Sequence, residues 1–185
     1  MIKDVLQDAR EHMEKTVSVL QGDLSAIRTG RASPRLLDPI EVDYYGVSTK
    51  LNQLAGITVP EPRLLVIRPW DPKTIGQIEK AILKSDLGLT PGNDGQVIRL
   101  VVPQLTEERR RELNKQVSKR VEEARVSARN IRRDAIDMMR EAEKEKMIDE
   151  DELFHGQKDV QKLTDDFIKQ IDEIGKAKEA EIMEV

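Results

Sequence analysis

The chain of 185 residues contains no cysteine and only two histidines, His12 and His155. The lack of cysteine excludes disulfide bonds, zinc ribbons and thiol chemistry, and two imidazoles are too few for a histidine-based metal site. A reducing compartment is compatible with this composition. We expect the protein to need neither a metal nor a cofactor.

Long apolar runs are also missing, since no segment approaches the roughly 18 apolar residues of a membrane-spanning helix. Residues 1–13 carry Asp4, Asp8 and Glu11 where a signal peptide would need an apolar core. The sequence therefore predicts a cytoplasmic protein that has no membrane partner.

Aromatic residues make up only 3% of the chain, as one Trp, two Tyr and two Phe. Such a small number of rings cannot form a base-stacking platform for single-stranded RNA. The phosphate-binding patterns GxxxxGK[ST] and GxGxxG do not occur, Ser33 and Ser85 have no histidine near them in the sequence, and no nucleophile signature is present. Carboxylate pairs such as Asp165-Asp166 are expected on solvated helix faces, so we predict that the protein is not an enzyme.

Charged residues, by contrast, are abundant: they form 36% of the chain, beside 38% hydrophobic residues. This balance is typical of long solvated helices with narrow apolar seams. Apolar residues three and four apart predict a first helix over 2–27 that ends near Thr29-Gly30. A second helix opens at Thr106 and keeps a 3.5-residue repeat over 117–142, with Met138 and Met139 both expected in its core.

A third helix follows a connector whose pattern is interrupted. Asp149, Asp151 and Gly156 break the apolar spacing, which resumes from Val160 to Ile174. We interpret Gly156 as a helix breaker, so the sequence leaves the start of this helix open between Asp149 and Gly156. Because none of the three helices can bury its seam alone, the sequence predicts a long three-helix bundle.

The segment between the first two helices has a different composition. All eight prolines lie between residues 34 and 103, which marks a second domain of the α+β class. Alternating and apolar runs predict strands at 40–44, 57–59, 64–67 and 97–102, a helix over 73–85, and a loop over 86–95. Trp70, Tyr44 and Tyr45 are interpreted as core and turn residues of this β/α/β domain.

The small domain must be inserted into the bundle. We expect the bundle to comprise residues 1–29 and 106–185 and the small domain to comprise residues 30–105. The two connections are single chain crossings with glycine and proline beside them, so a hinge is expected there. Its predicted residues are Thr29, Gly30, Arg31, Ser33, Pro34, Pro103, Gln104, Leu105 and Thr106.

The second helix carries a concentration of positive charge. Between Arg109 and Arg133 there are ten Lys/Arg residues against three glutamates, whereas the rest of the chain beyond Arg133 is strongly acidic. At about 100° per residue, most of these cations fall on one stripe beside the apolar seam. The stripe is formed by Arg111, Lys115, Arg125, Arg129, Arg132, Arg133 and Arg140.

Two interpretations of this stripe remain open. It is either a solvated flank whose cations pair with acids of the third helix, or a surface for a polyanion. Arginine forks suit bidentate phosphate contacts, which favours structured RNA recognised through its phosphates, with a steep salt dependence. An alternative function of another class is that of a coiled-coil adaptor or chaperone that assembles through the same seams. The three helices leave little apolar surface for self-association, so a monomer is expected.

Five segments, distributed from end to end, resemble the bacterial ribosome recycling factor family. They are Ile27–Pro34 (IRTGRASP), Asp86–Pro91 (DLGLTP), Thr106–Arg110 (TEERR), Arg129–Ala135 (RNIRRDA) and Asp159–Asp165 (DVQKLTD). The resemblance implies an L-shaped, two-domain protein similar in outline to tRNA. It also implies a function: binding to the large subunit of post-termination ribosomes, in the intersubunit space, and subunit dissociation driven by elongation factor G with GTP.

The resemblance also assigns residues. It implies contacts between large-subunit rRNA and Arg110, Arg129, Arg132 and Arg133, to which the position of Arg125 on the stripe adds a fifth candidate. It places the hinge at the two connections named above. No catalytic residue is implied, because the family acts by binding and displacement and the GTP belongs to the partner.

Overall fold

The computed structural model describes residues 1–184, which divide into two compact units. One unit is formed by Met1–Arg28 together with Glu107–Glu184, and the other by Thr29–Thr106. The first is helical and the second combines strands with helices. The predicted α+β class is therefore confirmed.

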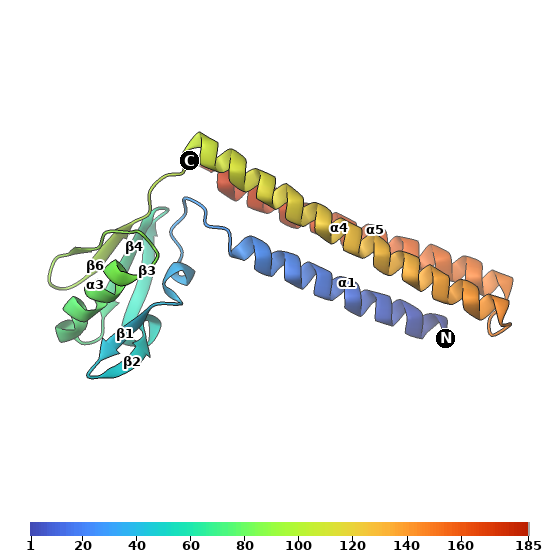
Figure 1. Ribbon diagram of the computed structural model, residues 1–185, viewed down its shortest axis with the longest axis horizontal. Helices are drawn as coiled ribbons and strands as arrows, with labels where there is room; N and C mark the ends of the chain where they lie inside the picture. Colours follow the sequence, from blue (N-terminus) through green and yellow to red (C-terminus); the bar gives the residue numbers. More distant parts are fainter. Residues whose placement is uncertain (185) are drawn as a thin grey trace. The chain divides into compact units, whose positions relative to one another are not determined.

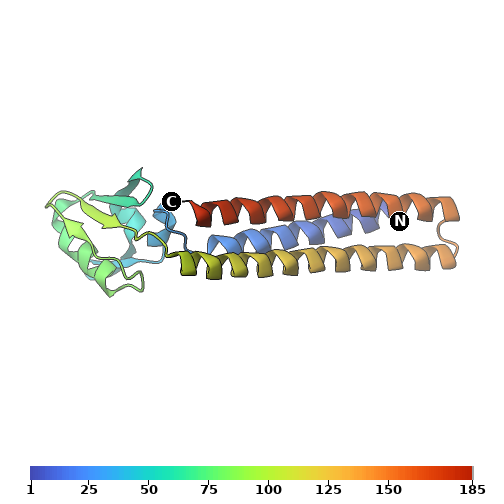
Figure 2. The same cartoon turned by 90° about the horizontal axis from the view of Figure 1, so that it is seen from above.

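Three long helices form the first unit: α1 (Ile2–Ser25), α4 (Glu107–Lys144) and α5 (Glu150–Met183). They lie side by side, and α4 runs antiparallel to the other two (Figures 1 and 2). The expected end of the first helix was wrong by several residues. The amide of Ile27 bonds the carbonyl of Leu24, which tightens the last turn and takes the chain out of the helix although the apolar spacing continues.

The apolar seams of the three helices form the core of the bundle. Val117, Val121, Ala128 and Ala135 of α4 are buried as expected. Met138, however, is 53% exposed, and its neighbour Met139 is completely buried. The expectation for Met138 was wrong because an α-helix has 3.6 residues per turn, so a strict 3.5-residue repeat drifts off the buried face.

The third helix begins earlier than the apolar pattern indicates. The Asp149 side chain accepts a hydrogen bond of 2.7 Å from the backbone N–H of Glu152 and caps α5. Gly156 lies inside this helix and is buried, and an added Cβ would stand 2.9 Å from the Met139 sulfur and 3.1 Å from Ile2. Its interpretation as a helix breaker was wrong, because here glycine permits a close approach of helices.

The second unit contains a four-stranded antiparallel sheet in the order β3-β4-β6-β5 and a separate β1-β2 hairpin. Two strands, β2 and β5, were not expected. β2 forms because Asp43 accepts a hydrogen bond from the Gly46 amide and closes a turn. The bounds are β1 Glu41–Tyr44, β2 Val47–Lys50, β3 Ala55–Glu61, β4 Leu64–Pro69, β5 Gly92–Asn93 and β6 Ile98–Val101, with helices α2 Leu51–Leu54 and α3 Ile75–Lys84 and 3₁₀ turns at Pro34–Leu37 and Pro72–Thr74.

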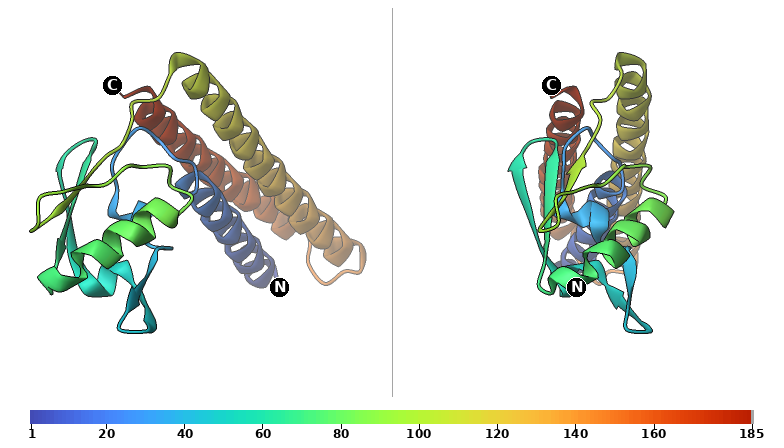
Figure 3. Two further views of the ribbon diagram at one scale, coloured as in Figure 1. Left: turned by 60° about the vertical axis from the view of Figure 1, so that its left-hand side comes forward. Right: turned by 90° about the vertical axis from the view of Figure 1, so that its left-hand side faces the viewer.

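Helix α3 covers one face of the four-stranded sheet (Figure 3). Its buried Ile78 and Ile82 belong to one cluster with Leu65, Ile67 and Leu100 of the strands. We expected Trp70 to lie in this core, and that expectation was wrong. Trp70 is 70% exposed and lies over Gly56, where a Cβ would stand 3.3 Å from its ring.

Within residues 1–184, none of the helices combines the length and the hydropathy that crossing a membrane requires.

Candidate nucleic-acid interface

All five candidate RNA-contacting arginines lie on α4, which fixes their relative positions along one rigid element. Arg125, Arg129, Arg132 and Arg133 follow one another at spacings of four, three and one, so they share one side of the helix. The buried seam of α4 fixes the rotation of the helix in the bundle. The stripe is therefore presented at the surface on the flank where Arg125 meets α5.

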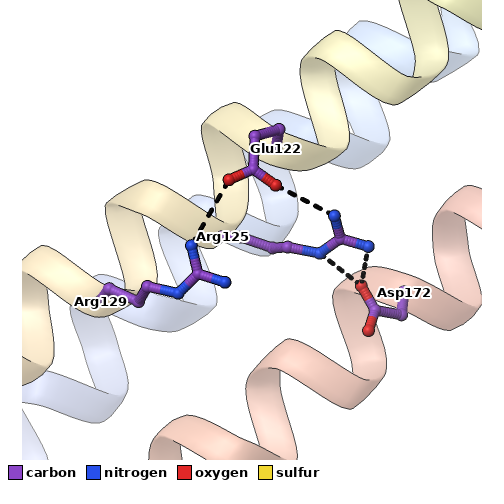
Figure 4. Close-up of polar contacts among 4 residues, drawn as sticks. All are labelled: Glu122, Arg125, Arg129 and Asp172. Atoms are coloured by element: carbon purple, nitrogen blue, oxygen red, sulfur yellow. Dashed lines mark hydrogen bonds and ion pairs between the residues drawn. The ribbon is translucent and has the colours of Figure 1, made fainter.

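Arg125 is held by two carboxylates (Figure 4). Its Nε and Nη2 atoms donate to one oxygen of Asp172 on α5, at 2.7 and 2.6 Å. Its Nη1 donates at 3.0 Å to Glu122, one turn earlier on α4. With 32% of its side chain exposed, Arg125 joins two helices while one edge of its guanidinium still reaches the surface.

Glu122 also contacts a second stripe arginine, since the Arg129 Nη1 lies 3.4 Å from its other oxygen. The Arg125 hydrogen bond, followed by the charge of Arg129, holds the pKa of Glu122 below its usual range. The hydrogen bond to Asp172, with that to Glu122, raises the pKa of Arg125. Glu122 is therefore an ionised acid placed inside the basic stripe.

Arg132 is positioned by a different chain of contacts. Its Nη1 donates at 2.9 Å to the Gln161 side-chain oxygen on α5, and the Gln161 amide nitrogen donates at 2.9 Å to Asp165. The Arg132 Nε is buried and has no hydrogen-bond partner among the described residues. This guanidinium is thus oriented across the two helices by a neutral amide, which leaves its positive charge uncompensated by that contact.

The remaining candidates differ in exposure. Arg133 is 65% exposed and has a long contact of 3.8 Å with Asp134. Arg110 is half-buried near the start of α4, and its Nε is buried without a hydrogen-bond partner in the described part of the chain. Across residues 1–184, Arg125 is the one stripe cation for which an ion pair with an acid of α5 is observed. The interpretation as a solvated flank paired with the third helix therefore fits Arg125 and not its neighbours.

Both predicted connections lie along one edge of the small unit. The Ala32 amide donates at 2.7 Å to the Pro62 carbonyl, and the Val102 amide donates at 2.8 Å to the Arg63 carbonyl, so one turn between β3 and β4 holds both. A Cβ on Gly30 would stand 3.4 Å from the Leu105 backbone nitrogen. The two chain crossings therefore run beside each other, and their role as a hinge stays a prediction.

Sequence reasoning missed Glu122, Asp172 and Gln161 as parts of this surface. Glu122 had a detectable signal, because it precedes Arg125 by three and Arg129 by seven residues and so shares their face. Asp172 and Gln161 had none, since their contacts depend on the register between α4 and α5. That register is set by side-chain packing rather than by any local pattern.

Comparison with known proteins finds relatives over the whole chain. Residues 20–183 match the family model described as ribosome recycling factor. The chain is 60% identical to the ribosome-recycling factor of Syntrophomonas wolfei and 56% identical to that of Bacillus subtilis, each over the full length of both chains.

Solved structures give the same result. A solution structure of the ribosome recycling factor matches with a TM-score of 0.75 and 43% identity, covering all of this chain and 98% of the other. A second match, with a TM-score of 0.65, 44% identity and full coverage of both chains, comes from models for the T. thermophilus ribosome recycling factor and the E. coli elongation factor G bound to the E. coli post-termination complex.

Proposed function

Because the chain belongs to the ribosome recycling factor family, whose members are non-enzymatic translation factors, we propose that it dissociates post-termination ribosomes into subunits. In this proposal the protein binds the large subunit in the intersubunit space. Elongation factor G, carrying GTP, then drives the separation and frees the ribosome from mRNA for another round of translation. The place of action is the bacterial cytoplasm, and the protein acts as a monomer.

The observation that carries this proposal is the oriented arginine stripe on α4 in a chain that matches its family over the full length. A relative that shares 44% of its residues occurs bound to a post-termination complex with elongation factor G. Ribosomal RNA offers a dense array of phosphates, and arginine forks bind phosphate oxygens bidentately. We therefore assign the ribosome contact to Arg110, Arg129, Arg132 and Arg133, and give Arg125 the supporting role developed below.

The mechanism needs no bond making by this chain. The bundle supplies a rigid rod whose phosphate contacts fix its position on the large subunit. The small unit, joined through the paired connections, receives the displacement that GTP hydrolysis on the partner produces. The proposed hinge comprises the predicted residues of both crossings, because a change of direction there breaks no strand pairing. These residues are Thr29, Gly30, Arg31, Ser33 and Pro34 on one crossing and Pro103, Gln104, Leu105 and Thr106 on the other.

Light scattering from purified post-termination ribosomes tests the function. We expect a fall in scattering when the protein, elongation factor G and GTP are all present, and no fall when any one of them is omitted. Unchanged scattering in the complete mixture, with an active relative as the positive control, would refute the proposal. Sedimentation of the protein as a homo-oligomer without RNA affinity would favour the adaptor instead.

The site assignment predicts the behaviour of Arg132→Ala. This substitution removes a guanidinium that Gln161 aims at the surface, so ribosome binding should weaken by about tenfold, the usual effect of losing one charge-assisted contact of about 1.4 kcal/mol. Unfolding should change little, because the side chain is not part of the apolar core.

Arg120→Ala is the matched control. Arg120 belongs to the same helix but lies beside α1, where it pairs with Glu123 at 3.2 Å. Ribosome pelleting at several protein concentrations gives both affinities. An Arg132→Ala protein that binds as tightly as the Arg120→Ala protein would remove Arg132 from the site.

A further inference from the structure

The basic stripe contains an acid that its proposed role does not explain. Glu122 lies two turns before Arg129 and one turn before Arg125, and its two oxygens are divided between them. A carboxylate in this position offers arginine the same kind of oxygen pair that a phosphate offers. The side chain of Glu122 is 53% exposed, so a competing anion can reach the same cations.

The two arginines are held unequally. Arg125 makes contacts to two carboxylates, with two of its nitrogens on Asp172 at 2.6 and 2.7 Å. Arg129 has one contact of 3.4 Å with Glu122 and a half-exposed side chain. Because a single long, exposed contact contributes little, Arg129 can exchange its partner at low cost. Arg125 would have to give up a bridge between two helices.

Resting on the function proposed above, we propose that Glu122 is an internal substitute for an RNA phosphate. In the free protein its carboxylate bridges Arg125 and Arg129, with one oxygen on each. When RNA binds, a phosphate displaces Glu122 from Arg129, while Arg125 stays on Asp172 and acts as a positioning residue. Glu122 therefore weakens RNA binding, because each binding event must break its contact and bring a phosphate near a carboxylate.

Substitution of Glu122 by glutamine tests this directly. Glu122→Gln keeps the size of the side chain but removes the charge that competes with phosphate. If one additional counterion is released on binding, the slope of log affinity against log salt becomes steeper by about 0.7 to 0.9, which corresponds to about fivefold tighter binding near 0.1 M salt. The probe is a purified post-termination ribosome, and bound protein is measured by pelleting across a salt series.

Glu123→Gln provides a closely matched control. It makes the same change of net charge one residue away, but Glu123 pairs with Arg120 on the α1 side of α4. We expect this variant to bind within about twofold of the wild type, because only the screened long-range field changes. Circular dichroism establishes that both variants are folded. Equal gains in affinity for the two glutamine variants would overturn the proposed role of Glu122.

A double variant identifies the arginine involved. In an Arg129→Ala background, Glu122→Gln should gain less than about twofold, because the exchanging cation is absent. A fivefold gain that persists in this background would overturn the exchange at Arg129. Failure of the wild type to bind ribosomes would instead overturn the proposed function itself. The two failures are therefore distinguished in the same series of measurements.

Discussion

Gly175 lies at a close contact between α5 and α4, and a methyl group there should push the helices apart. An ideal Cβ on Gly175 would stand 2.6 Å from the Val121 Cγ2, whereas carbon atoms pack about 3.5 to 4.0 Å apart. Relief therefore needs a shift of roughly 1 Å. Val121 is buried, and a β-branched side chain in a helix has essentially one rotamer, so the helices themselves must move.

The expected magnitude follows from two opposing terms. Overpacking of a helix contact typically costs about 1 to 3 kcal/mol, while alanine stabilises a helix interior by about 1 kcal/mol relative to glycine. Gly22, on α1, has no atom within 4 Å of its would-be Cβ, so Gly22→Ala isolates the second term. Gly175→Ala should thus be about 1 to 3 kcal/mol less stable than Gly22→Ala.

Thermal unfolding followed by far-ultraviolet circular dichroism measures this difference. One kcal/mol corresponds to about 2 to 4 °C in a chain of this size, so the two midpoints should differ by at least about 2 °C. Val121→Ala in the Gly175→Ala background should recover part of the loss, because it removes the clashing methyl group. If Gly22→Ala and Gly175→Ala raise the midpoint equally, the proposed close contact is refuted.

Two further predictions concern hydrogen-bonded side chains. Asp94 accepts hydrogen bonds from the Val97 amide and from Arg99, which lower its pKa below the ordinary value of 3.8. The ionised Asp94 therefore stabilises the folded small unit above pH 3.8, and this stabilisation is lost as the pH falls through the lowered pKa. Asp94→Asn should therefore flatten the acid dependence of small-unit unfolding, followed by tryptophan fluorescence, and an unchanged dependence would contradict this. Gln161→Ala should weaken ribosome binding by leaving Arg132 without its anchor, with an unaltered unfolding midpoint; wild-type affinity would argue against this positioning.

The seams of the three helices could be predicted because burial follows the helical period, which the sequence displays directly. The start of α4 at Glu107 agrees with the predicted opening at Thr106. The end of α1 and the start of α5 could not be predicted, since they depend on individual hydrogen bonds. Asp149 caps α5 well before the apolar pattern resumes, and glycine at position 156 serves packing against Met139 instead of interrupting the helix. A glycine in a sequence does not reveal whether the chain turns there or another helix approaches.

The sequence was sufficient to predict which cations share the candidate site, but not which side chains they contact. The arginines of α4 share a face because of their spacing, and the same arithmetic applies to Glu122. The contacts of Arg125 with Asp172 and of Arg132 with Gln161 depend on the register of α5 relative to α4. That alignment results from the close contact at Gly175, one turn beyond Asp172, and from the capped turn that joins the helices.

The salt dependence of binding to isolated ribosomal subunits tests the central claim most directly, namely that the stripe on α4 contacts large-subunit RNA phosphates. We predict that the wild type binds the large subunit in preference to the small one. Arg132→Ala and Arg133→Ala should each lower the slope of log affinity against log salt by about 0.7 to 0.9, and Arg120→Ala should leave it unchanged. Slopes that are identical in all four proteins, or equal binding to the small subunit, would contradict the claim.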